Sequence, residues 1–136
     1  MAGRRVGLVL GSTEISDSMK RVKQPYNGSG IAQTTVVAAR DVGGKVKNWM
    51  KSALQQREVL AKSLGCFDFV KRVYTSDANF ILVKVTDANA VYRFLLDEKV
   101  VVRNRNNVEL CEGCLRITVG TSEENSRLLT AWAKFE

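Results

Sequence analysis

Apolar residues recur at helical spacing through residues 45–64, which predicts a long amphipathic helix. They fall at every third or fourth position, as on one face of an α-helix: Val46, Trp49, Met50, Ala53, Leu54, Leu60, Ala61 and Leu64. Gly65 follows directly, and glycine is the typical residue just past a helix C-terminus. We expect the apolar stripe to be packing surface.

Beyond Gly65 the pattern changes to short segments rich in β-branched and aromatic residues. Residues 69–74 and 80–85 fit two strands, residues 100–103 a third and residues 114–119 a fourth, since such residues favour a pleated, half-buried surface. We therefore expect four strands in the second half of the chain.

Two helices are predicted among these strands by capping residues and apolar faces. Asp87 can cap the first, and Thr121 with Glu124 has the spacing of a capping box for the last. The residues expected to face inward are Val91, Phe94 and Leu95 in the first, and Leu128, Leu129 and Trp132 in the second. The order helix, β, β, α, β, β, α predicts a compact α+β unit with mixed strand pairing.

The first forty residues fit this unit poorly. Residues 6–10 (VGLVL) are typical of a buried strand. Ser12 can cap a short helix over residues 14–20. A loop is expected over residues 24–30 and a second helix over residues 31–40. A buried strand needs neighbours on both sides, and the sequence supplies none before it. We therefore expect the chain to begin inside a larger domain.

Composition limits the classes of function that the chain can have. It has 136 residues, a net charge of +7 and no histidine, so histidine-dependent nucleophiles and histidine-ligated metals are excluded for this chain acting alone. No apolar run reaches the roughly 20 residues of a membrane span, and no signal peptide opens the chain, so we expect a cytoplasmic protein without a membrane partner. The basic residues are scattered, which suits either a solvated surface or small anionic partners.

The cysteines are Cys66, Cys111 and Cys114. Cys111 and Cys114 form a C-x-x-C pair, but a zinc site needs a second pair of ligands and a redox pair usually precedes a helix, whereas a strand follows here. We interpret them as incidental and expect no metal site.

Arg116 lies in the middle of the fourth predicted strand. Alternation puts it on one face with Cys114 and Thr118, opposite Leu115, Ile117 and Val119. An arginine in such a strand must be paired or bind an anion. A salt bridge is one interpretation, with Asp87, Glu98 and Glu112 as available partners. The other is an anion receptor in which Arg103, at the end of the third strand, joins Arg116.

The second interpretation gains weight from a family resemblance that extends over essentially the whole chain. Four segments in this order resemble histidinol-phosphate aminotransferases: P-Y-N-G-S-G at residues 25–30, T-S-D-A-N-F-I-L-V at 75–83, V-V-V-R-N-R at 100–105, and G-C-L-R-I-T-V-G-T followed by S-E-E-N at 113–125. In that family a lysine forms the Schiff base with pyridoxal 5'-phosphate (PLP) a few residues before an A-G-x-R-x-G motif. Ala2, Gly3, Arg5 and Gly7 match this motif, and Met1 stands between it and the expected lysine.

The resemblance implies a role for three arginines. Arg5 would contact the PLP phosphate, Arg116 would bind the substrate carboxylate or phosphate, and Arg103 would be a second anion ligand. The Schiff-base lysine would lie upstream of Met1, so no catalytic residue is expected in this chain. Tyr26 and Asn79 also lie in matching segments, with Asn79 equally suited to a backbone turn.

The resemblance also implies an architecture and partners. The fold would be the C-terminal part of a fold-type I PLP transferase: residues 1–28 a remnant of the large domain, 29–65 bridging helices and 66–136 the small domain. The complete enzyme would be a homodimer that exchanges an amino group between histidinol phosphate and glutamate or 2-oxoglutarate, in histidine biosynthesis.

Surfaces facing the large domain would be exposed in this chain.

Related PLP enzymes, namely an aromatic-amino-acid aminotransferase or a threonine-phosphate decarboxylase, would use Arg116 in the same way. Two other readings remain: a non-catalytic aminotransferase-like partner, and a basic nucleic-acid-binding module. The last lacks an aromatic RNP pair, a GxxG loop and a clustered basic helix, so no nucleic-acid partner is expected.

Overall fold

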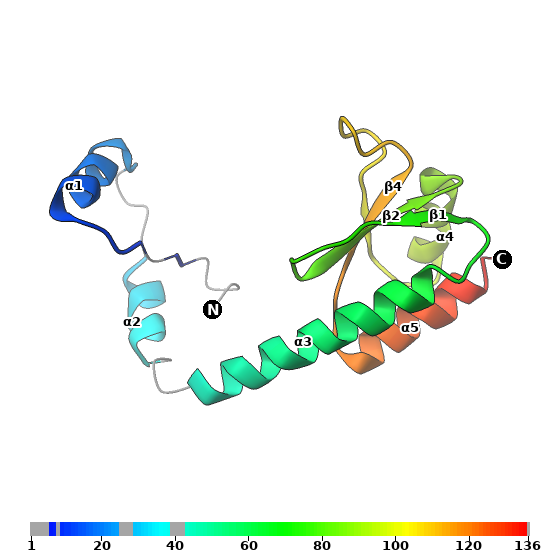
Figure 1. Cartoon of the computed structure of the whole chain (residues 1–136), viewed down its shortest axis with the longest axis horizontal. Helices are drawn as coiled ribbons and strands as arrows, with labels where there is room; N and C mark the ends of the chain where they lie inside the picture. The colour runs from blue at the N-terminus through cyan, green and yellow to red at the C-terminus, as the bar shows by residue number, and fades with distance from the viewer. Residues whose placement is uncertain (1–5, 8, 25–28, 39–42, 136) are drawn as a thin grey trace. The chain divides into compact units, whose positions relative to one another are not determined.

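The computed structural model describes residues 6–7, 9–24, 29–38 and 43–135 (Figure 1). The chain divides into two compact units, Met1–Val46 and Lys47–Glu136. The helix α3 (Gly43–Leu64) crosses this division. Each unit is described by itself.

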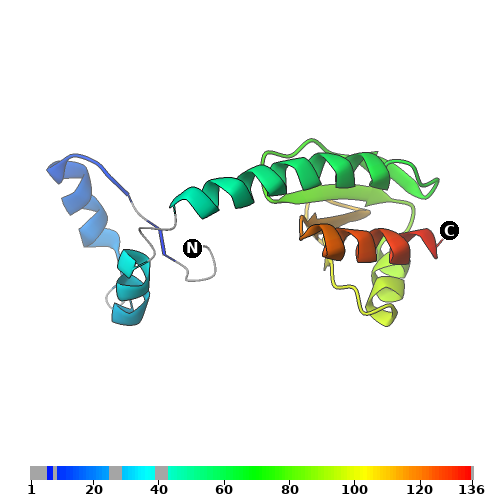
Figure 2. The same cartoon turned by 90° about the horizontal axis from the view of Figure 1, so that it is seen from below.

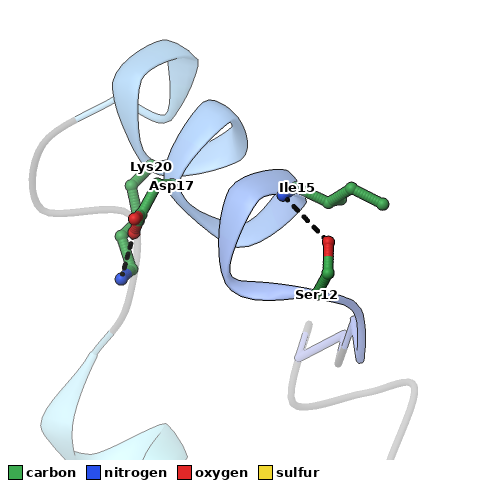
Figure 3. A network of polar contacts seen from close by, with 4 residues as sticks. All are labelled: Ser12, Ile15, Asp17 and Lys20. Carbon is green, nitrogen blue, oxygen red and sulfur yellow. Dashed lines mark hydrogen bonds and ion pairs between the residues drawn. The ribbon is translucent and has the colours of Figure 1, made fainter.

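The first unit contains helices α1 (Thr13–Val22) and α2 (Gly30–Ala38). As predicted, Ser12 caps α1, and its Oγ accepts a hydrogen bond from the Ile15 N–H at 3.4 Å (Figure 3). Lys20 Nζ donates to Asp17 at 2.9 Å one turn along the same helix. Neither helix buries a described residue, so the described contacts that stabilise α1 are local ones within the helix.

The strand expected over residues 6–10 is wrong for the residues described there. Residues 6, 7, 9 and 10 have no strand pairing, and Leu10 is 96% exposed. An apolar segment becomes a strand only when neighbouring strands accept its backbone hydrogen bonds.

The second unit has the predicted order of elements and is an α+β fold. After α3 come β1 (Val70–Val73), β2 (Phe80–Val85), α4 (Ala88–Asp97), β3 (Arg103–Asn104), β4 (Cys114–Thr118) and α5 (Ser122–Ala133). The sheet order is β1-β2-β4-β3, and every pair is antiparallel. The mixed pairing that we expected is therefore wrong.

One face of the sheet carries the core of this unit. Ile81, Val83, Leu115 and Ile117 are buried on that face, together with residues of three helices: Leu60 and Leu64 of α3, Ala88, Val91 and Leu95 of α4, and Leu128, Ala131 and Trp132 of α5. Figure 2 shows α3 and α5 in front of the strands, on one side of the sheet. Arg116 lies on the opposite face, and the buried core residues of α3, α4 and α5 that the structure describes all belong to the first face.

The third strand is shorter than predicted. Of residues 100–103 only Arg103 belongs to β3, and Val101 is 79% exposed. The Val100 N–H donates to Leu95 O, which ties this segment to the end of α4 instead of to β4. Three consecutive valines favour a strand, but the backbone contact to the preceding helix directs the chain away from the sheet.

The apolar stripe of α3 is buried only at its C-terminal end. Leu60 and Leu64 lie in the core, whereas Trp49 is 64% exposed and Met50 and Leu54 are exposed as well. Within this chain, therefore, only the C-terminal end of the expected packing surface is buried. Neighbouring exposed apolar side chains on one helix are typical of a surface that another polypeptide covers.

The capping box of α5 is present. Thr121 Oγ1 accepts from the Glu124 N–H, and Glu124 Oε2 accepts from the Thr121 N–H at 2.7 Å. Hydrogen bonds from the Thr121 backbone first, and from its side chain second, lower the pKa of the Glu124 carboxyl below its ordinary value of 4.5. Gly120 makes room for the carboxylate, since a Cβ there would lie 2.6 Å from Glu124 Oε2.

We expect Thr121→Ala to lower the free energy of unfolding by about 1 kcal/mol at pH 7, the usual effect of losing an N-cap side chain. The difference from wild type should narrow only slightly as the pH falls through the lowered folded-state pKa of Glu124, because the alanine variant keeps the backbone N–H that is the main cause of that lowering and lacks only the smaller side-chain contribution. Urea unfolding at pH 7 and pH 3 measures both. Thr130→Ala, also exposed on α5, is the control and should change little at either pH.

Candidate functional site

Arg103 and Arg116 lie directly opposite each other on β3 and β4. They are register partners in the antiparallel pair, and the neighbouring Arg105 N–H donates to Cys114 O at 2.9 Å. Opposed residues of such a pair project from the same face of the sheet, with Cβ atoms about 4.5–5.5 Å apart. Like charges at this spacing repel each other, so the pair is a site that an anion would stabilise.

The guanidinium of Arg116 stacks over the aromatic ring of Phe80. Its guanidinium carbon lies 5.1 Å from the centre of the Phe80 ring, and Leu82 is its register partner on β2. Arg116 Nε is buried and has no hydrogen-bond partner among the described residues. A desolvated N–H of this kind costs free energy until an acceptor reaches it, which favours an anion-binding role.

The salt bridges that would explain Arg116 structurally are not formed. Glu98 pairs with Lys134, and Asp87 Oδ1 accepts from the Asn89 and Ala90 N–H groups at the start of α4. No carboxylate in the described part of the chain forms an ion pair with Arg116. The salt-bridge interpretation is therefore wrong in this structure.

The same face of the sheet carries further positive charge that the sequence alone did not bring together. Lys84 pairs with Cys114 on β4 and with Arg72 on β1. The Arg72 guanidinium carbon lies 4.8 Å from the centre of the Tyr74 ring, a second arginine held by an aromatic side chain. Because the basic residues of this face lie on four different strands, only the pairing register reveals their common face.

Of the remaining sequence candidates, the structure describes only Asn79. Arg5 and Tyr26 lie outside the described residues. Asn79 is exposed, and its carbonyl accepts from the Val119 N–H at 2.9 Å, so its backbone closes the end of the β2–β4 pair.

A cavity of about 410 Å³ lies beside the segment that precedes β3, but neither arginine of the pair lines it. Its lining includes Val102, Ile117, Thr118 and Asn125. The candidate anion site is therefore the open face of the sheet. In the described part of the chain no group of three or more cysteines and carboxylates could hold a metal ion. No helix described there is long and apolar enough to cross a membrane.

Curated relatives cover nearly all of this chain. The chain is similar to the histidinol-phosphate aminotransferase of Flavobacterium psychrophilum, with 41% identity over 131 residues, and to that of Parabacteroides distasonis, with 42% identity over 130 residues. Each alignment covers 96% of this chain, but only 37% and 38% of the respective relative. The chain thus spans less than two fifths of the length of these relatives.

Solved structures agree on the fold. The histidinol-phosphate aminotransferase of Clostridium acetobutylicum superposes with a TM-score of 0.79 at 22% identity, over 90% of this chain and 38% of that one. The L-threonine-O-3-phosphate decarboxylase of Porphyromonas gingivalis superposes with a TM-score of 0.68 at 17% identity, over 93% of this chain and 40% of that one. The family profile described as aminotransferase class I and II matches residues 1–131. The chain therefore belongs to the class I and II aminotransferases.

Proposed function

We propose that this chain supplies the substrate-anion receptor of a PLP-dependent aminotransferase that acts on histidinol phosphate. The observation that carries the proposal is the opposed pair Arg103 and Arg116, with Arg116 Nε buried and free of any partner among the described residues. The names of the similar curated relatives support the choice of substrate.

The arginine pair suits both substrates of such a reaction. Histidinol phosphate brings a phosphate and glutamate brings carboxylates, and a guanidinium binds either through two parallel N–H···O bonds. Phe80 holds the Arg116 guanidinium, which reduces the entropy lost when an anion binds. The role of these residues is to bind and orient the substrate while a cofactor supplies the chemistry.

The described residues do not themselves make a PLP site. When bound, PLP supplies the electron sink for amino-group transfer. The arginine implied to contact its phosphate, Arg5, lies outside the described residues, and no lysine precedes the A-G-x-R-x-G motif in this sequence. We therefore assign no step of the reaction to a residue of this chain acting on the cofactor.

The remaining expectations are proposals of the same kind. Residues 66–136 would be the small domain of the complete enzyme, residues 29–65 the bridging helices and residues 1–28 part of the large domain. The exposed apolar face of α3, at Trp49, Met50 and Leu54, is of the kind that such a large domain would cover. A homodimer and a cytoplasmic location also stay predictions.

A chimera tests the proposed function. The matching C-terminal segment of the Flavobacterium psychrophilum relative is replaced by this chain, and amino transfer from glutamate to imidazole-acetol phosphate is measured. We expect turnover within about tenfold of the unaltered relative, since a loss of less than about 1.4 kcal/mol in transition-state binding corresponds to that factor. This chain alone should give no turnover.

Two further substrates test whether histidinol phosphate is the preferred one. If a chimera that is folded and loaded with PLP transaminates an aromatic amino acid, or decarboxylates threonine phosphate, in preference to the histidinol-phosphate reaction, the proposed substrate is wrong. A folded, loaded chimera without any of these activities would favour the non-catalytic interpretation instead.

A further inference from the structure

A tight turn brings Cys111 and Cys114 together at the start of β4. The Cys114 N–H donates to Cys111 O at 2.9 Å, and Gly113 has a φ of +76°. A hydrogen bond across four residues and a positive φ at the third position, where glycine is favoured, define a type II β-turn. Its ends have Cα atoms less than about 7 Å apart, and disulfides need a Cα separation of about 4.4–6.8 Å.

The loop around this turn holds both cysteines in place. The Cys111 N–H donates to Val108 O at 2.9 Å, so a second turn leads directly into the first. Asn106 Oδ1 accepts from the Gly113 N–H at 2.8 Å, which ties the turn to the other side of the loop. The two cysteines therefore stay close without any movement of the strands.

The two thiols differ in access to solvent. Cys114 is buried, and its Sγ lies 3.8 Å from Glu112 O inside the turn. Burial raises the pKa of its thiol, and the neighbouring Cys111 adds to the increase. Cys111 is half-buried. A disulfide in solution can thus react with Cys111 first. Cys114 is shielded from solvent, so it reacts only once Cys111 beside it has become a mixed disulfide.

We propose that Cys111 and Cys114 form a reversible intramolecular disulfide across this turn, which makes the start of β4 a thiol-oxidation site. The oxidant is a small disulfide of the glutathione class. The Cys111 thiolate attacks one sulfur of the oxidant, which releases one glutathione thiolate and leaves a mixed disulfide. The Cys114 thiolate then attacks the Cys111 sulfur and releases the second glutathione thiolate. Two electrons pass to the oxidant, and the two cysteine protons end on the two released thiols.

The location gives this site a consequence for the sheet. Cys114 is two residues before Arg116 on the same strand, and it pairs with Lys84 on β2. Oxidation therefore adds a covalent link to the turn that leads into the basic face of the sheet. The disulfide itself does not depend on the proposed aminotransferase function.

The test uses the full chain with Cys66→Ser, since Cys66 is an exposed third thiol. The folded protein is equilibrated with mixtures of reduced and oxidised glutathione, acid-quenched and weighed by mass spectrometry. We expect oxidised chains to lose two hydrogens, about 2 Da, without a bound glutathione, and to regain them in excess reduced glutathione. Digestion should recover the bond between Cys111 and Cys114.

Two variants make the outcome decisive. Cys111→Ser should lose the internal disulfide with its circular dichroism unchanged, because residue 111 is not in the core. Cys114→Ala should stop the reaction at a glutathione adduct on Cys111. Stable glutathione adducts on Cys111 in the parent chain, or no reaction at either cysteine, would overturn the proposal.

Discussion

Replacement of Trp132 by alanine is expected to remove most of the stability of the second unit. The side chain is 0% exposed and packs against Phe69, with ring centres 5.4 Å apart. Tryptophan-to-alanine changes in a core cost about 3–5 kcal/mol, and small domains have only about 5–15 kcal/mol in total. Urea unfolding followed by circular dichroism at 222 nm measures the loss.

Two control variants separate packing from other effects of the change. Trp49→Ala removes the same side chain from an exposed position on α3, and we expect a change within about 0.5 kcal/mol. Trp132→Phe keeps an aromatic ring beside Phe69 and removes an indole N–H that has no partner among the described residues, so its loss should be smaller than that of alanine. A loss below about 1 kcal/mol for Trp132→Ala would show that α5 is not part of the cooperative unit.

The features that the sequence predicted well are those with a local cause. Ser12, Asp87 and Thr121 each cap the helix that follows them, because a cap depends on a side chain and the next three backbone N–H groups. The alternation in β4 is also local: Leu115 and Ile117 are in the core while Arg116 is not. A period of two fixes the faces of a strand before its partners are known.

The features that the sequence missed depend on partners far along the chain. Residues 100–103 have strand-forming side chains, yet the hydrogen bond from Val100 to Leu95 keeps all but Arg103 out of β3. Residues 6, 7, 9 and 10 have no neighbouring strand among the described residues. The direction of strand pairing is a tertiary property as well, which is why the mixed sheet was wrong.

The candidate site divides in the same way. Arg116 could be singled out because an arginine between apolar residues in a strand is unusual. The opposition of Arg103 needs the register of β3 and β4, and the nearby Lys84 and Arg72 need the register of two more strand pairs. The ring of Phe80 beneath Arg116 has a sequence signal only in retrospect: residues 80 and 116 point to one face once β2 and β4 are aligned.

Arg116→Met is expected to weaken anion binding and, at the same time, to leave the fold at least as stable as before. Methionine keeps an apolar contact with Phe80 but removes the charge opposite Arg103 and the buried Nε–H that lacks a partner. Loss of one arginine of a two-arginine receptor should raise the Kd for histidinol phosphate at least tenfold, about 1.4 kcal/mol. Removal of an unpaired buried donor can raise the free energy of unfolding by up to about 1–3 kcal/mol.

Both effects can be measured on this chain. Histidinol phosphate and inorganic phosphate are titrated at fixed salt while the arginine Nε–H signals are followed by nuclear magnetic resonance, and stability is measured by urea unfolding. Arg93→Met is the matched control, since Arg93 is exposed on α4, a helix that packs against the other face of the sheet. An equal loss of affinity in the control would mean that the anion responds only to net charge. If Arg116→Met instead lowers the free energy of unfolding, Arg116 supports the fold and the receptor must be sought elsewhere. A higher free energy of unfolding together with weaker anion binding would indicate a residue that serves ligand binding at a cost in stability.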